Sequence, residues 1–140
     1  MIKIFACCFT LLLATHATAA EKLFDAHVHY NAAHAVHYPP ELIIAILDQN
    51  TISHAVVTSN PPEHVKLLQL YAPERVIPLL GVYENADDKE NWTEDSSLPE
   101  RIEEQLKQGG WRGIGELHLF ADDRHSPVFL RIIELAGQYR

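Results

Sequence analysis

Two imidazole side chains, His27 and His29, stand two positions apart in an apolar stretch (residues 23–30) that is typical of a β-strand. Alternate residues of a strand point to the same face, so both rings should project together. Imidazole nitrogens in such a pair suit zinc, iron, nickel or copper. Two neighbouring buried histidines without a cation would be costly to satisfy, so we expect a metal site. Asp25 shares their face and is expected either to orient one imidazole as a hydrogen-bond acceptor or to pair with a nearby base.

Glu116 and His118 repeat this spacing within a second apolar stretch, residues 113–120. A carboxylate buried alone in such a strand is costly, so Glu116 needs a partner. A divalent ion held by the first imidazole pair would be one partner, and Arg112 at the mouth of the strand is the alternative. We expect Glu116 to be a third metal ligand with a catalytic role. His118 is interpreted as a second catalytic residue, acting as a ligand, a substrate contact or a polar residue at the rim.

The positions of these residues depend on four alternations of strand and helix. We predict strands at residues 23–30, 54–59, 79–83 and 113–120, and helices at residues 40–49, 62–71, 99–108 and 127–139. Such alternation predicts parallel strands joined by right-handed crossovers. The chemistry would then lie at the carboxyl ends of the strands, where α/β folds place their active sites. Pro78 would remove a hydrogen bond from a central strand, so the third strand is expected to start at residue 79.

Capping and packing signals accompany these elements. Asn60 and Ser126 precede prolines and are predicted to be helix N-caps. Gly113 and Gly115 alternate with Glu116 and are expected to let a helix pack closely on their face. The last helix should bury one stripe of apolar residues: Phe129, Ile132, Ile133 and Ala136.

The first twenty residues predict export. One positive charge precedes an apolar run of about eleven residues, and small residues follow, which is typical of a secretory signal peptide cleaved after Ala19 or Ala20. The run is too short for a membrane anchor, which needs roughly 20 apolar residues. We therefore expect a secreted or periplasmic protein with its mature domain at residues 21–140 and no membrane contact after cleavage. Cleavage removes both cysteines, so metal ligands in the mature chain must be histidine or carboxylate.

Composition and charge narrow the class of partner. Of the 140 residues, 47% are hydrophobic, which is typical of a folded domain. The formal net charge is −8, which disfavours nucleic acid and anionic membrane surfaces and leaves a small-molecule substrate. Residues 84–104 carry nine acids against two bases. We interpret this segment as a solvated loop rather than a cation site.

With His27 and His29 on the first strand and Glu116 on a glycine-framed fourth strand, the chain resembles the amidohydrolase superfamily of metal-dependent hydrolases. It is most similar to the TatD-like and amidohydrolase-related branches. The resemblance implies a (β/α)8 TIM-type barrel, of which residues 21–140 would form the N-terminal half, four of the eight units. It also implies that His27, His29 and Glu116 bind one or two divalent ions, most simply zinc, whose activated water attacks a small amide or ester.

The same resemblance exposes a difference. Family members carry further histidine ligands on strands five and six and an aspartate on strand eight, whereas this sequence stops after the fourth helix. We expect a truncated, weakly active or inactive chain, or two half-barrels that associate. His34, His37 and His125 lie in predicted loops at the same end and are further nitrogen donors. The alternatives left open are a non-catalytic periplasmic metal-binding protein, a TatD-type nuclease and a decarboxylase.

Overall fold

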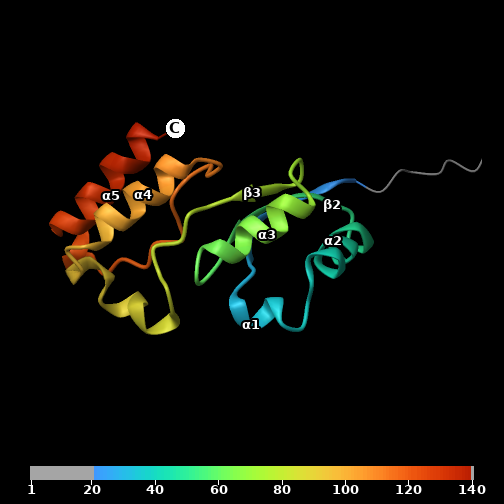
Figure 1. Ribbon diagram of the computed structural model, residues 1–140, viewed down its shortest axis with the longest axis horizontal. Coiled ribbons are helices and arrows are strands. Elements are labelled where there is room, and N and C mark those ends of the chain that lie inside the picture. Colours follow the sequence, from blue (N-terminus) through green and yellow to red (C-terminus); the bar gives the residue numbers. More distant parts are fainter. Residues whose placement is uncertain (1–20, 140) are drawn as a thin grey trace, which may run out of the picture.

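A parallel sheet of three strands, in the order β1-β2-β3, organises the first half of the chain (Figure 1). Its strands are β1 (Leu23–His29), β2 (Ile52–Thr58) and β3 (Val76–Pro78). The computed structural model describes residues 21–139, so the signal peptide expected at residues 1–20 lies outside the described residues. Within the described range, no helix has the length and apolar character needed to cross a membrane. The predicted α/β class with parallel strands is confirmed.

Helices α2 (Pro40–Gln49) and α3 (Glu63–Tyr71) cover one face of this sheet and occupy the predicted segments. α2 begins with a proline, whose missing N–H costs nothing at the first helical position. The two helices pack on alternate residues of β2 in one buried cluster: Tyr30, Leu47, Ala55, Val57, Val65, Leu68 and Val76. Burial of these apolar side chains is the main stabilisation of this half. The opposite face exposes Phe24 and His54, whose rings stack 6.2 Å apart.

The predicted third strand at residues 79–83 is wrong, because β3 is Val76–Pro78 and ends at the proline. Of the predicted residues, Leu80 forms a single bridge. The N–H of Leu79 donates to the carbonyl of Val57 on β2 at 2.9 Å, so the nitrogen of the preceding proline faces away from β2. The missing N–H therefore breaks no bond to β2. The carbonyl of Pro78 accepts from the N–H of Arg112 at 2.9 Å, which begins the next pairing.

The predicted fourth strand is reduced to one parallel bridge between Leu80 and Ile114. Leu80 donates to the carbonyl of Gly113 at 2.9 Å and accepts from the N–H of Gly115 at 3.0 Å. The segment at residues 112–115 thus lies beside the continuation of β3, as expected for a fourth parallel element. Residues 116–120 leave the ladder because their main chain bonds to side chains elsewhere. Four barrel units are therefore not formed as complete strand–helix repeats.

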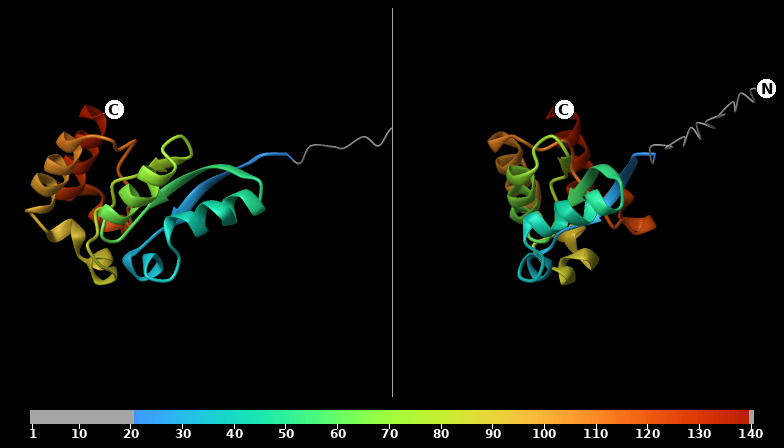
Figure 2. Two further views of the ribbon diagram at one scale, coloured as in Figure 1. Left: turned by 45° about the vertical axis from the view of Figure 1, so that its right-hand side comes forward. Right: turned by 90° about the vertical axis from the view of Figure 1, so that its right-hand side faces the viewer.

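The second half of the chain packs helices on the segment that follows β3 (Figures 1 and 2). α4 (Leu98–Gln108) and α5 (Pro127–Gln138) match the predicted helices closely. Short helices absent from the prediction are α1 (Ala32–Ala35), η1 (Ala86–Glu90), η2 (Trp92–Glu94) and η3 (Ala121–His125). The core of this half consists of Leu80, Val82, Tyr83, Trp92, Leu98, Ile102, Leu106, Val128, Ile132 and Leu135. The acidic segment therefore contains one buried aromatic residue, Trp92, as well as exposed acids.

Two capping predictions have different outcomes. Ser126 caps α5, because its hydroxyl accepts from the N–H of Phe129. Asn60 is not the N-cap of α3, since that position falls on Pro62. The hydroxyl of Ser59 instead accepts from the N–H of Val65 at 3.1 Å, two residues inside the helix. The cis bond between Asn60 and Pro61 turns the chain before the helix begins.

Two packing predictions need correction. The predicted stripe of α5 is right for Ile132, which is buried, and for Phe129, which packs against the core. Ile133 is 48% exposed, because α5 turns Val128 and Leu135 inward beside Ile132. A side-chain carbon added to Gly113 would lie 3.1 Å from the side chain of Leu79, so the neighbour of this glycine is the adjacent strand segment and not a helix.

Candidate metal centre

The carboxyl end of β1 places His27 and His29 beside Glu116, which follows the Leu80–Ile114 bridge. The two imidazole Nε2 atoms are 2.9 Å apart. Oε2 of Glu116 lies 3.2 Å from Nε2 of His29 and 3.7 Å from Nε2 of His27. Within residues 21–139 this is the one group of three or more His, Cys, Asp or Glu side chains whose ligand atoms lie close enough together to hold a metal ion. The structure thus gathers all three predicted ligands.

The three ligand atoms have the spacing that a tetrahedral ion requires. Zinc ligands at about 2.0–2.1 Å in tetrahedral geometry lie about 3.3 Å from one another. The three distances here are 2.9, 3.2 and 3.7 Å. Each of the three atoms can offer a lone pair to a cation, provided that both imidazoles carry their proton on the other ring nitrogen. The residues therefore fit a divalent ion bound by imidazole and carboxylate.

His118 orients the carboxylate of Glu116. Its Nε2 lies 2.9 Å from Oε1, while Oε2 faces the two imidazoles. Oε1 of Glu116 therefore accepts from His118, and Oε2 faces the candidate ion position. A ligating carboxylate fixed in this way loses less conformational freedom when it binds a cation.

The main chain of His118 is held from two sides by buried aromatic residues. Its N–H donates to the hydroxyl of Tyr83 at 2.5 Å, and its carbonyl accepts from Nε1 of Trp92 at 2.6 Å. The rings of Tyr83 and His118 lie 5.8 Å apart. Both aromatics belong to the core of the second half, so that core fixes the position of His118 and, through it, Glu116.

The residues before Glu116 are tied to the end of β2. The hydroxyl of Thr58, 5% exposed, donates to the carbonyl of Gly115 at 2.9 Å. Nearby, a side-chain carbon at Gly81 would lie 2.8 Å from the carbonyl oxygen of Ser59, so glycine is required for this close approach. The carboxyl ends of β1, β2 and the segment after β3 are thus held together at one edge.

The surroundings favour the protonation states that bind a cation. Desolvation lowers the pKa of His29 against the raising effect of Glu116, and the charges of His27 and Lys89 lower it further. Desolvation acts to raise the pKa of Glu116, but the hydrogen bond from His118 and the imidazole charges outweigh it, so its pKa is lowered. Because a metal ligand must be deprotonated, a neutral His29 and an ionised Glu116 are the forms needed.

In the part of the chain that the structure describes, Asp25 does not bond to an imidazole ring, and Arg112 does not pair with Glu116. The carboxylate of Asp25 accepts from the main-chain N–H of His27 at 3.1 Å, at an irregularity in the pairing of β1 with β2, and so acts on the backbone. Arg112 is exposed, and within the described residues the ion-pair partners of Glu116 are His27, His29 and His118.

The loop histidines remain outside the group. Nδ1 of His34 accepts from the N–H of Asn31 at 3.2 Å in the first turn of α1. His37 and His125 are exposed, and none of the three joins the group of ligand atoms described above.

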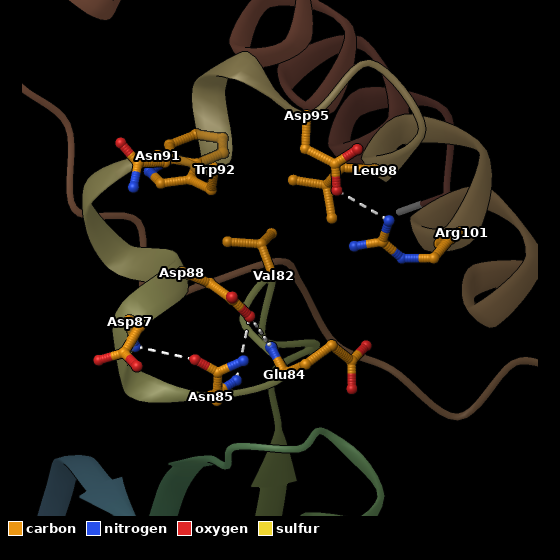
Figure 3. Close-up of a pocket in the computed structure, with 10 residues that line it drawn as sticks. All are labelled: Val82, Glu84, Asn85, Asp87, Asp88, Asn91, Trp92, Asp95, Leu98 and Arg101. Atoms are coloured by element: carbon orange, nitrogen blue, oxygen red, sulfur yellow. Dashed lines mark hydrogen bonds and ion pairs between the residues drawn. The ribbon is translucent and has the colours of Figure 1, made fainter.

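A cavity of about 470 Å³ lies in the acidic segment, apart from the metal-ligand group (Figure 3). Two of its four acids, Asp88 and Asp95, already have partners. Oδ2 of Asp88 accepts from the N–H groups of Glu84 and Asn85 at 2.8 and 3.0 Å, and Asp95 accepts from Arg101 at 2.8 Å. This pattern agrees with the interpretation of the segment as solvated structure rather than a cation site.

Three residues that the sequence analysis does not assign to the site hold it in place: Thr58, Tyr83 and Trp92. Each acts on the main chain of residues 115–118, and side-chain contacts to the main chain leave no spacing pattern in one sequence. The aromatic type of Tyr83 and Trp92 within an acidic stretch is the nearest signal. Comparison of the chain with protein-family models, curated proteins and solved structures gives no match.

Proposed function

We propose that this chain is the N-terminal half of an exported metal-dependent hydrolase of the amidohydrolase type, acting on a small amide or ester. The observation that carries the proposal is the convergence of His27, His29 and Glu116 on one point from segments far apart in sequence. The proposal takes β1, β2, β3 and residues 112–115 as the first four strands of a TIM-type barrel. The uncovered face of the sheet would then line the barrel interior.

In this proposal His27, His29 and Glu116 hold one divalent ion, and zinc suits their nitrogen and oxygen ligands. When bound, such an ion supplies Lewis acidity and lowers the pKa of a water molecule toward neutrality. Glu116 contributes its charge through Oε2 and stays ionised because of its surroundings. His118 holds a proton at Nε2 against Oε1 of Glu116, which keeps the carboxylate aimed and places a proton carrier beside the reacting group.

Turnover tests this function. The zinc-loaded chain is assayed against small amides and esters, beside the Glu116→Gln variant and an Asp87→Asn control from the acidic cavity. Since the chain is expected to be a weakly active half, we expect slow zinc-dependent hydrolysis that Glu116→Gln abolishes, because it removes the ligand charge, and that Asp87→Asn leaves unchanged. Hydrolysis that persists after chelation and in Glu116→Gln would overturn the proposal. Cleavage of DNA or release of carbon dioxide in its place would reassign the reaction.

Metal binding without catalysis is the second candidate. The small number of polar groups at the site favours this candidate. Within the described residues, the acids and histidines there are the three ligands and His118, which bonds to Glu116. Their side chains are 30–50% exposed. One equivalent of zinc bound with no hydrolysis of any substrate tested would support this candidate over the enzyme.

Export belongs to the same proposal, through a signal peptide at residues 1–20. Amino-terminal sequencing of the protein recovered from its native compartment tests it. We expect the mature chain to begin at Ala20 or Glu21, and retention of Met1 in the mature protein would contradict export by cleavage.

A further inference from the structure

Lys89 is a cation beside the candidate metal centre that no contact described above employs. It is the one basic residue between positions 84 and 95, and it is partly buried whereas most acids around it are exposed. Its Nζ lies 5.9 Å from the centre of the Tyr83 ring. This is the outer limit of a cation–π contact, so the contact with the ring contributes little to holding the ammonium group.

The acids of the same segment leave Lys89 available. Among the described residues no carboxylate oxygen lies within ion-pair distance of its Nζ. The carboxylate of Asp88, its immediate neighbour, is occupied by the main-chain N–H groups of Glu84 and Asn85. An ammonium group in an acidic stretch without an acidic partner is free to bind an anion that comes from outside the chain.

Tyr83 links Lys89 to the candidate centre. Its hydroxyl accepts from the main chain of His118, and its ring lies 5.8 Å from the His118 ring, which bonds to Glu116. This chain of neighbouring side chains places Lys89 on the same side of the molecule as the three ligands.

We propose that Lys89 is a substrate-binding residue that receives a carboxylate group, so that the substrate class is a small molecule with a carboxylate near the bond that reacts. This inference rests on the proposed function, since the metal centre defines which bond reacts. One ammonium group balances one negative charge, whereas a phosphate dianion would meet stronger repulsion from the surrounding acids. In a chain of net charge −8, Lys89 together with a divalent ion supplies a local region of positive potential.

Binding of acetate and of its neutral counterpart acetamide tests this proposal. Both are titrated by NMR into the full chain, with and without zinc, for the native protein, Lys89→Met and the control Lys107→Met. Lys107 is an exposed lysine of α4 that pairs with Glu103. We expect acetate to bind more tightly than acetamide, and Lys89→Met to weaken acetate about fivefold, the upper range for a partly exposed ion pair. Lys107→Met and all acetamide titrations should be unchanged.

Several results would overturn it: no acetate binding in either metal state, equal binding of acetate and acetamide, an unchanged affinity in Lys89→Met, or an equal loss in Lys107→Met. Zinc affinity is measured on the same samples by competition with a coloured chelator. Failure to bind zinc would refute the proposed function, while the acetate titrations without zinc would still decide the role of Lys89. Zinc binding with no effect of Lys89→Met on acetate would refute this inference alone.

Discussion

The candidate metal centre at Glu116 and the acidic cavity of Figure 3 differ in what their carboxylate oxygens face. Glu116 directs Oε2 at two imidazole nitrogens that carry lone pairs when neutral. In the cavity, Asp88 and Asp95 face main-chain N–H groups and Arg101, which are permanent donors. In the first arrangement a cation can replace the imidazole proton, because each ring can shift its proton to its other nitrogen, whereas the donors of the second arrangement are fixed.

This difference shows that acidity alone does not predict a cation site. The segment at residues 84–104 is the more acidic of the two regions, yet Asp88 in it shapes a short helix and Asp95 holds Arg101. Glu116 is a single acid, but its neighbours are themselves ligands.

Removal of both imidazoles should abolish metal binding. We expect His27→Ala/His29→Ala to lower zinc affinity more than about 100-fold, beyond the 10–100-fold loss typical when an outer hydrogen-bond partner is removed. The matched variant Glu84→Ala/Asp87→Ala, from the acidic cavity, should bind zinc as the native chain does. Equilibrium dialysis with elemental analysis measures both. The contrast fails if the cavity variant loses zinc or if the imidazole variant keeps it.

His118 should influence zinc through Glu116 rather than as a ligand. We expect His118→Ala to lower zinc affinity about 10–100-fold, the usual effect of losing a residue that orients a ligand. His118→Gln should recover part of this loss, because its amide can donate to Oε1. His125→Ala is the control, since His125 is exposed on η3. Equal losses in the Ala and Gln variants, or none in either, would argue against an orienting role.

Thr58 should matter for stability because its buried hydroxyl donates to the carbonyl of Gly115. Thr58→Val leaves that carbonyl without its donor, which should lower the free energy of unfolding by about 1–3 kcal/mol. Thr51→Val is the matched control, since the hydroxyl of Thr51 makes a longer contact of 3.4 Å in an exposed position. Urea unfolding monitored by circular dichroism measures both variants, and equal stability of the two would refute the proposed importance of Thr58.

Asp95 should give the smallest and most pH-dependent effect. Hydrogen bonds from Ser97 and Arg101 lower its pKa from 3.8 to about 2. A carboxyl whose folded pKa lies below its unfolded value stabilises the fold above the unfolded pKa, and this stabilisation disappears as the pH falls through the folded value. Asp95→Asn should therefore cost less than about 1 kcal/mol at pH 7. The difference from the native chain should shrink between pH 4 and 2, and a difference that is constant over this range would contradict the pairing.

Helices and strands of this fold could be predicted from the sequence where a local signal determines them. Prolines at helix starts and apolar periodicity place α2 and α5 almost residue by residue. The bounds of β3 at Pro78 could not be predicted in this way, because the direction in which the proline nitrogen faces depends on the partner strand. Residues 116–120 have strand-like composition, but Tyr83 and Trp92 hold their main chain outside the ladder.

The candidate ligands follow the same logic. His27, His29 and Glu116 are identifiable because two-residue spacing on strands has one geometric consequence, a shared face. The residues that hold them, Thr58 and Tyr83, act through single contacts to distant main-chain atoms. Those contacts depend on how two halves of the chain pack, which no local pattern encodes.

X-ray absorption spectroscopy of the zinc-loaded chain tests the central claim most directly, because it reports the atoms bound to the ion. We predict one equivalent of zinc with nitrogen and oxygen neighbours at about 2.0–2.1 Å and the multiple-scattering signature of two imidazoles. A spectrum without imidazole scattering, or a chain that retains no zinc after dialysis, would contradict the assignment of His27, His29 and Glu116 as a metal centre.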